Sequence, residues 1–487
     1  MSSWEKKGTR RVWWGCGIAL LLCTLGLAAL SHHFEYGSDM RARPILPFVG
    51  LLMGAALVYF VGVYMALQTA PTQRLAFGIF AAGALMRLIL ATSQPVLEDD
   101  YYRYLWDGAV TAHGENPYGV IPLDVQERDE DITDTLLALG DEAGMVLERV
   151  NHPQLGTVYP PVAQAAFALA HAVSPWKLSG LRLLYYALDC AVFALLVALL
   201  RQLGRSPLLT LIYWWNPLAA KEIYNSVHMD LLLVPLLLGA VLLALRGRII
   251  WSMLPLALAV ATKLWPVLLL LPLLATARHT PRKAGIALVV FLLGSGLLLS
   301  PILTITALED ESGFVAYGSR WEMNDALFMV FPWIAEGAAH LFQMDLSHGT
   351  AHRAGKALVA LLTLGVVAWV TRTAYRSHGA VGQQAAHSLC GGLLAIVGAL
   401  FLLSPTQFPW YFLWLLPLLS LYPNRGLLLL TLVLPLYYLR FYFDARGAVE
   451  FFHYRIVWFE YLPVWSLLLF DAYQKKSRMG RATNVLC

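Results

Sequence analysis

An acidic string with an arginine close behind it offers the clearest chemistry in this sequence. Glu98, Asp99 and Asp100 are consecutive, and Arg103 follows three residues after Asp100. Adjacent carboxylates beside an apolar surface repel one another and lose hydration, and both effects raise the pKa of at least one of them. Such a carboxylate can take a proton from a hydroxyl group, and the planar guanidinium of Arg103 suits a phosphate. The structural alternative, an acidic first turn that stabilises a helix N-terminus, stays open at this point.

A second group of ionisable residues lies within ten positions, next to long apolar runs. It consists of Lys221, Glu222, His228 and Asp230. Charged groups close to hydrocarbon are costly and usually face a polar cavity, although an internal Lys–Glu pair that caps two helices would also explain them. Lys263 is a lone cation between two apolar runs; it either snorkels to the interface or provides a point charge for a lipid-linked phosphate.

The composition excludes a soluble protein. Of the 487 residues, 58% are hydrophobic and 14% are charged, whereas soluble chains carry about 25% charged residues. So much apolar surface is stable only in a bilayer, which favours helices. We therefore predict an all-α, polytopic transmembrane helix bundle. No basic block indicates nucleic acid. The cysteines show no metal or redox spacing, and no metal ligand is assigned.

Apolar runs of about 20 residues predict the membrane crossings, and cationic loops orient them with the N-terminus inside. The predicted crossings are 12–31, 45–68, 75–93, 180–200, 207–223, 229–246, 249–262, 264–277, 284–304, 354–374, 384–403, 409–422, 427–444 and 455–472. Those at 249–262, 264–277 and 409–422, and the one at 207–223, are short for a full crossing. The alternation holds only if 161–174 is a juxtamembrane helix.

Two large loops then lie on the outer side, at 94–179 and 305–353. Between residues 94 and 160 there are 14 carboxylates against 3 arginines, and we expect amphipathic helices near 100–113 and 133–149 along the membrane surface. The second loop contributes Arg320. We predict three parts: a tail and transmembrane hairpin at 1–70, a catalytic module at 71–305, and a C-terminal transmembrane module at 306–487.

The acidic string resembles the first-loop motif of the GT-C superfamily of membrane glycosyltransferases. The resemblance is strongest to enzymes of the bacterial polyprenyl-phosphate-mannose type and the GPI mannosyltransferase I type. It covers most of the chain from about residue 75. In this superfamily the acidic loop usually follows the first span, whereas here it follows the third, so the hairpin at 1–70 is interpreted as an addition. The motifs that carry the resemblance, besides the acidic string and Asp107, are Asn116-Pro117-Tyr118, Tyr159-Pro160-Pro161, Lys221-Glu222 with His228 and Asp230, Thr262-Lys263 with Pro266, and Pro409-Trp410-Tyr411.

The resemblance implies a glycosyltransferase that moves a sugar, with mannose favoured, from a polyprenyl-phosphate donor by an inverting single displacement. By motif position Asp100 is the base, followed by Asp99, with Glu98 in support. The residues expected to bind the phosphate or the sugar are Arg103, Lys221, Glu222, His228, Asp230, Lys263, Tyr159 and Arg320. No cofactor is implied, although the carboxylates leave a divalent cation open.

Expected partners are the lipid-linked donor, membrane lipid, and a glycan, glycolipid or protein acceptor. We expect a bacterial cytoplasmic membrane with the site facing outward; the endoplasmic reticulum stays open. The main alternative is a transporter or flippase of a lipid-linked sugar, which would use the intramembrane charges as a pathway. An O-antigen ligase would carry a late, basic loop, and a scaffold would not gather polar residues at one interface.

Overall fold

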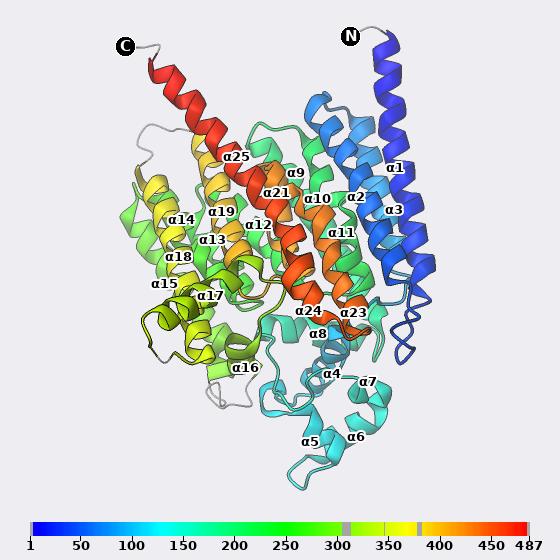
Figure 1. The fold of residues 1–487 in the computed structure, drawn as a ribbon. Helices are drawn as coiled ribbons and strands as arrows, with labels where there is room; N and C mark the ends of the chain where they lie inside the picture. Colours follow the sequence, from blue (N-terminus) through cyan, green and yellow to red (C-terminus); the bar gives the residue numbers. More distant parts are fainter. Residues whose placement is uncertain (1–2, 304–312, 345, 377–381, 485–487) are drawn as a thin grey trace.

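The protein is an all-helical bundle (Figure 1). The computed structural model describes residues 3–303, 313–344, 346–376 and 382–484. In these ranges the backbone forms helices and connecting turns, with one isolated β-bridge between Met323 and Thr406. The predicted all-α class is therefore confirmed, as expected for a chain whose backbone groups must be satisfied inside a bilayer.

Nine helices in the described ranges are long and apolar enough to cross a membrane. About 20 apolar residues match the thickness of the hydrocarbon core, so the chain is an integral multi-pass membrane protein. The nine are α1 (Ser3–Ser31), α2 (Ile45–Gln68), α3 (Gln73–Leu90), α9 (Leu178–Gln202), α15 (Pro281–Leu303), α18 (His348–Arg376), α19 (Gln383–Leu403) and the composite helices Arg425–Asp444 and Val449–Lys475.

The segments predicted to be short are short. The apolar helices Ile249–Val260, Trp265–Ala277 and Pro409–Leu421 fall below the length of a full span. The predicted crossing at 207–223 is not among the long apolar helices, and the chain there forms a succession of short helical pieces. The last piece, Pro217–Asn225, meets Met229–Leu245 at an angle of 104°. The Asn-Pro pair at 216–217 and the turn before it explain the earlier interruption, between Leu211–Trp214 and Pro217–Ala220, since proline cannot continue a helix.

Asn225, next to the break in this bent pair, bonds the backbone of residues 94–96. Val227 has a φ of 61°, which is rare for a β-branched residue. The Asn225 side-chain oxygen accepts a hydrogen bond from the Val96 amide at 3.1 Å. Its amide donates to the Ser93 hydroxyl at 2.8 Å and to the Gln94 carbonyl at 2.6 Å. These bonds tie the break to the segment that leads into the acidic string, where irregular backbone needs internal partners.

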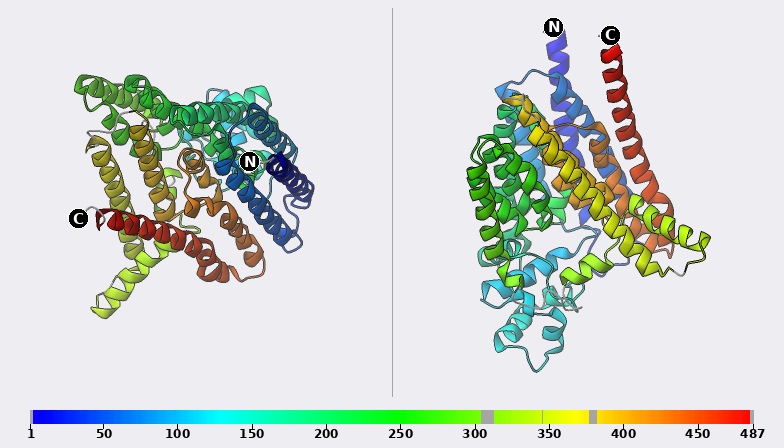
Figure 2. Two further views of the ribbon diagram at one scale, coloured as in Figure 1. Left: turned by 90° about the horizontal axis from the view of Figure 1, so that it is seen from above. Right: turned by 90° about the vertical axis from the view of Figure 1, so that its left-hand side faces the viewer.

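A small helical layer lies at the end of the bundle opposite the two termini (Figures 1 and 2). The predicted helix near 100–113 is confirmed, and the one near 133–149 is divided at Gly144, where φ is 49°. The segment predicted as a juxtamembrane helix at 161–174 is also helical and is too short to span a bilayer. The helices are α4 (Asp100–Ala112), α5 (Pro122–Glu127), α6 (Asp134–Ala143), α7 (Met145–Glu148) and α8 (Pro161–Val173).

Gly108 explains the close packing of α4 on α8. A Cβ atom at this position would lie 2.6 Å from the Phe167 carbonyl oxygen, which no side chain tolerates. Tyr104, one turn earlier, stacks on Phe167 with ring centroids 4.6 Å apart. The helix that begins with the acidic string is therefore fixed against the juxtamembrane helix along its length.

A buried ion pair joins α3 to α9 away from this layer. Arg87 and Asp189 are fully buried, and their side chains meet at 2.5 Å. Asp189 also accepts hydrogen bonds from Tyr213 and Tyr224, and Arg87 donates to the Trp214 carbonyl. Charges inside a membrane protein are stable when paired in this way, and this pair positions the helix that precedes the acidic string.

Both chain ends lie at the same end of the bundle (Figure 1). The helical layer of the acidic loop lies at the other end, in agreement with the loop arrangement predicted from the cations. The helix α2 packs against pieces of the C-terminal bundle, including Leu430–Val433 and Leu439–Asp444. The division into parts at 1–70, 71–305 and 306–487 stays a prediction.

Candidate active site

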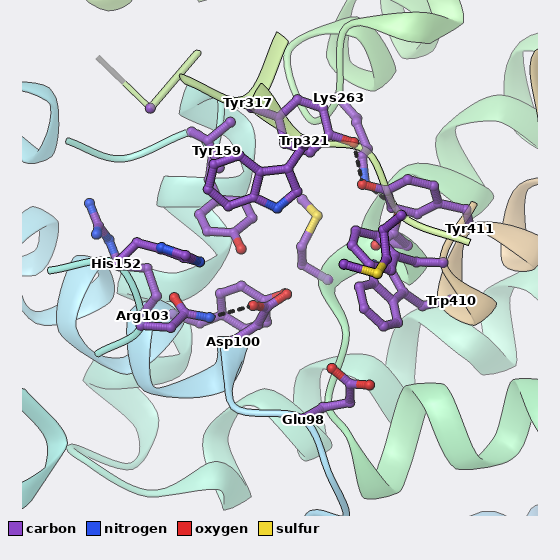
Figure 3. A pocket seen from close by; sticks show the side chains of 18 of the residues that line it. Glu98, Asp100, Arg103, His152, Tyr159, Lys263, Tyr317, Trp321, Trp410 and Tyr411 are labelled. Carbon is purple, nitrogen blue, oxygen red and sulfur yellow. Dashed lines mark hydrogen bonds and ion pairs between the residues drawn. The ribbon is translucent and has the colours of Figure 1, made fainter. Parts of the chain in front are cut away.

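A cavity of about 750 Å³ opens between the acidic loop and the bundle. Its wall combines carboxylates, cations and many aromatic rings (Figure 3). Segments far apart in the sequence meet there, from the acidic string to the last quarter of the chain. Of the residues singled out from the sequence, those that line it are Glu98, Asp99, Asp100, Arg103, Tyr159, Asp230 and Lys263.

Asn151 holds the two aspartates of the string together. Its side-chain amide donates to Asp100 at 2.8 Å and to Asp99 at 3.1 Å. Asp99 occupies the N-cap position of α4, but its side chain makes no capping hydrogen bond. Asp100 lies in the first turn of this helix, so the structural alternative of an acidic first turn still applies to it. Asp100 points into the cavity (Figure 3), and its side chain is 27% exposed.

Burial changes the acidity of all three carboxyl groups. It raises the pKa of Asp100 to about 6, with a further increase from the neighbouring Asp99 charge. Burial also raises the pKa of Asp99, and it raises the pKa of Glu98 well above the usual range. A carboxylate with a pKa near 6 is mostly ionised at neutral pH and is still basic enough to accept a proton from a hydroxyl group in a transition state.

Arg103 is the centre of a hydrogen-bond network beside the cavity. Its Nε lies 2.9 Å from the Asp107 carboxylate, and Nη2 donates to the Leu155 carbonyl at 2.9 Å. The other Asp107 oxygen accepts hydrogen bonds from Thr157 and Gln164. The network joins α4 to the segment that returns to the membrane. These contacts occupy Nε and one Nη2 hydrogen of the guanidinium. Binding of a phosphate by Arg103 therefore stays a prediction.

Lys263 and Asp230 form a pair on the opposite wall (Figure 3 shows Lys263). The Lys263 ammonium lies 2.7 Å from the Asp230 carboxylate and 4.1 Å from the centre of the Tyr411 ring. Trp414 donates to the same Asp230 oxygen at 2.6 Å. An ammonium has three donors, so Lys263 can contact Asp230 and still present a proton to an anion in the cavity.

His228 connects the cavity to a buried group behind it. Its Nδ1 lies 3.8 Å from Asp100, and its Nε2 lies 3.4 Å from Glu222. Glu222 and Lys221 are both bonded to the Tyr438 hydroxyl. Lys221, Glu222 and His228 are fully buried and lie behind the cavity lining. Their contacts fit the internal Lys–Glu pair, and any role in substrate binding would act through His228.

Aromatic side chains cover much of the remaining wall. Trp410 stacks on His228 with centroids 3.9 Å apart, and the Tyr317 and Tyr411 hydroxyls meet at 2.5 Å. Tyr159 lies on the side of the cavity opposite Trp410 and Tyr411, the same side as Asp100 (Figure 3). Such rings suit both sugar faces and prenyl chains. The side chain of Arg320, predicted as a binding residue, lies outside the described residues.

Among the cavity residues that were not predicted to be site residues, two polar ones matter most. Asn151 bonds both aspartates. Arg440, in α23 (Leu439–Asp444), lines the cavity, and its Nε is buried without a hydrogen-bond partner in the described part of the chain. Nothing in the local sequence distinguishes it from an ordinary interfacial cation.

Two family models match the chain. The model described as alpha-(1->6)-mannopyranosyltransferase, N-terminal domain, matches residues 18–280. The model of glycosyltransferase family 87 matches residues 157–405. Each match covers more than half of the chain, and the overlap contains Asp230 and Lys263. The comparisons with curated proteins and with solved structures returned no match.

Proposed function

The chain belongs to the alpha-(1->6)-mannopyranosyltransferase and family 87 glycosyltransferases, and we propose that it transfers mannose from a polyprenyl-phosphate donor to an acceptor hydroxyl. The transfer takes place on the membrane face opposite the termini, the outer face of a bacterial cytoplasmic membrane. The observation that supports it best is the position of Asp100: a carboxylate with a pKa of about 6 in a cavity that also holds cations and aromatic rings.

The lining of the cavity favours a lipid-linked donor. The cavity lies where the acidic loop meets the apolar helices, and its wall includes Leu264, Trp265, Leu400 and Phe441. A prenyl chain remains in the hydrocarbon layer while its phosphate and sugar reach the interface. Lys263 and Arg440 provide positive charge for that phosphate. A nucleotide-sugar donor would have no use for the apolar part of this wall.

The reaction is a single displacement. Asp100 accepts the proton of the acceptor hydroxyl as that oxygen attacks the anomeric carbon. The bond from the anomeric carbon to the phosphate oxygen breaks, and polyprenyl phosphate leaves with the electron pair. Attack from the side opposite the leaving group inverts the anomeric configuration. Asn151 keeps Asp100 in place, and the cations stabilise the charge that develops on the leaving phosphate.

Labelled donors test this assignment directly. We expect purified protein in proteoliposomes to transfer radiolabelled mannose from polyprenyl-phosphate-mannose to a mannoside acceptor. It should transfer none from GDP-mannose in the same vesicles. Movement of intact donor between leaflets without transfer would indicate a flippase, and transfer from GDP-mannose alone would exclude the lipid donor. Product analysis would also establish whether the linkage is α-1,6.

The rate of transfer should depend on pH through Asp100. We expect kcat/KM to be constant above about pH 7 and to fall as the pH drops through about 6, because burial beside Asp99 raises the pKa of Asp100 to about 6. A base is active only when it is deprotonated, so each pH unit below this value lowers kcat/KM about tenfold. Initial rates between pH 4.5 and 8.5 measure this fall, the acid limb of the pH profile. A flat profile down to pH 4.5 contradicts the role of Asp100.

Asn151→Ala should move this limb. The amide bonds the charged form of Asp100, which lowers the carboxyl pKa. Its loss raises the pKa, and we expect the acid limb to shift upward by about one pH unit. Asn116→Ala is the matched control, because Asn116 lies in the same loop and its side chain accepts a hydrogen bond from the Tyr118 amide, away from the aspartates. An equal loss of rate at every pH would mean that Asn151 acts only on the fold.

A further inference from the structure

A group of imidazole and carboxylate side chains lies outside the lining of the cavity that holds Asp100, where α17 (Ala326–Leu341) meets α18. Glu336 comes from α17, and His348 and His352 come from the first turns of α18. Ligand atoms of these three residues lie within 4.8 Å of one another. We propose that they form a zinc-binding site on the same end of the protein as the acidic loop.

The donor set is the chemical basis of the proposal. His348 and His352 are four residues apart on one helix, a spacing that places both rings on one face, and their centroids are 4.1 Å apart. The carboxylate of Glu336 lies 2.7 Å from His348 Nδ1. Two histidines and one glutamate, with a fourth position for water, bind Zn²⁺ in proteins. Imidazole ligands favour zinc over Mg²⁺ or Ca²⁺, which prefer oxygen.

A second carboxylate orients one of the two histidines. Glu322 lies 2.5 Å from His352 Nδ1 and 3.1 Å from the Lys356 ammonium. A hydrogen bond from Nδ1 to a carboxylate leaves Nε2 unprotonated, and this fixes the tautomer that a metal requires. Metal-ligating histidines almost always have such a partner. Glu322 is not a member of the three-residue cluster, and its contact with His352 supports the same ligand.

The site is open to the surrounding solution. The His348 side chain is 77% exposed and Glu336 is 35% exposed, whereas His352 is 24% exposed and closer to the bundle. An ion can therefore enter from solution and be held between two helices. The carboxylate and imidazoles already approach one another, so binding requires only that the ion replace the contact between Glu336 and His348.

Zinc at this position would brace one wall of the cavity. Glu322 lines the cavity, and the next residue, Met323, forms the bridge with Thr406. The ion would hold α17 on α18 and, through His352 and Glu322, keep this segment in place. We therefore expect binding to stabilise the fold, with the mannosyl chemistry remaining at Asp100.

Zinc content and thermal stability test the site without any assay of transfer. The full chain is purified in detergent with its affinity tag removed, treated with a chelator, and dialysed against Zn²⁺. We expect about one zinc per chain by elemental analysis and a higher Tm for the zinc-loaded protein. Zinc content indistinguishable from a protein-free blank, or an unchanged Tm, overturns the proposal.

Three variants locate the ion. His348→Ala and His352→Ala should each lose stoichiometric zinc, and Glu322→Gln should weaken zinc affinity by about tenfold through loss of the orienting hydrogen bond. His340→Ala is the matched control, because His340 is an exposed histidine on α17 that is not in the cluster, and it should keep zinc at the wild-type level. Equal zinc binding by a His348→Ala/His352→Ala double variant would place the ion elsewhere and overturn the proposal.

Discussion

Asp100→Asn is expected to lower the rate of mannosyl transfer by about 10²–10⁴-fold, the usual contribution of a general base. The amide has nearly the shape of the carboxylate but cannot accept the proton of the acceptor hydroxyl. The cavity and the contact with Asn151 should persist, so binding of the donor should change little. Single-turnover rates in proteoliposomes at saturating donor measure the effect, and fluorescence-detected gel filtration verifies folding.

Asp99→Asn is the matched comparison for this prediction. Asp99 also accepts a hydrogen bond from Asn151, but its charge acts on Asp100 by raising the pKa of that carboxyl. Its removal should lower the pKa of Asp100 and move the acid limb to lower pH, with a smaller loss of rate. If Asp99→Asn abolishes transfer while Asp100→Asn remains active, the two residues exchange roles. Wild-type rates for both variants would exclude the two aspartates as the base.

Much of the fold could be predicted because the bilayer enforces it. The apolar runs at 45–68 and 180–200 are long in the sequence, and each lies within one helix of the structure. A break near Val227 was predicted, because the predicted crossings 207–223 and 229–246 end and begin on either side of it, but the bend of 104° was not. The side chain of Asn225, next to the break, bonds backbone groups more than a hundred positions earlier. Such compensation belongs to tertiary structure.

The candidate site was predictable where the chemistry is concentrated in a short string. Asp100, Asp230 and Lys263 each follow or interrupt an apolar run, so their position at one interface could be inferred, and they do meet at one cavity. Lys221 and Glu222 have the same sequence pattern but turn away from the cavity toward Tyr438. Only packing distinguishes these two outcomes. The histidines at 348 and 352 have helical spacing for a metal, but Glu336 on another helix completes the group.

Arg440 is the most informative cavity residue that the sequence did not indicate. It lies outside both stretches matched by the family models, in a composite helix that reads as an ordinary span. Its Nε is buried without a hydrogen-bond partner among the described residues, although the side chain lines the cavity. A buried donor without a partner costs folding free energy. A substrate phosphate that accepts from this donor would remove that cost, which argues that Arg440 binds the donor lipid.

Arg440→Gln is expected to lower kcat by about 10²–10³-fold, as loss of one preorganised donor to a developing charge does. The donor phosphate has one negative charge before the reaction and gains another as the glycosidic bond breaks. The guanidinium therefore stabilises the transition state more than the bound donor, and kcat should fall more than KM rises. Arg440→Lys should recover part of the rate, because a point charge keeps the attraction and loses the forked geometry.

Two measurements separate this role from a structural one. The Tm of Arg440→Gln should change little, because the loss of the guanidinium contacts with Tyr437 and Phe441 is offset by removal of a buried Nε that lacks a partner among the described residues. Arg446→Gln is the matched control: Arg446 lies two residues beyond α23, is exposed, and its guanidinium contacts the Tyr442 ring and backbone carbonyls. It should keep wild-type kcat. If Arg440→Gln transfers mannose within threefold of wild type, the leaving phosphate is not held there, and Lys263 becomes the main cation at that position.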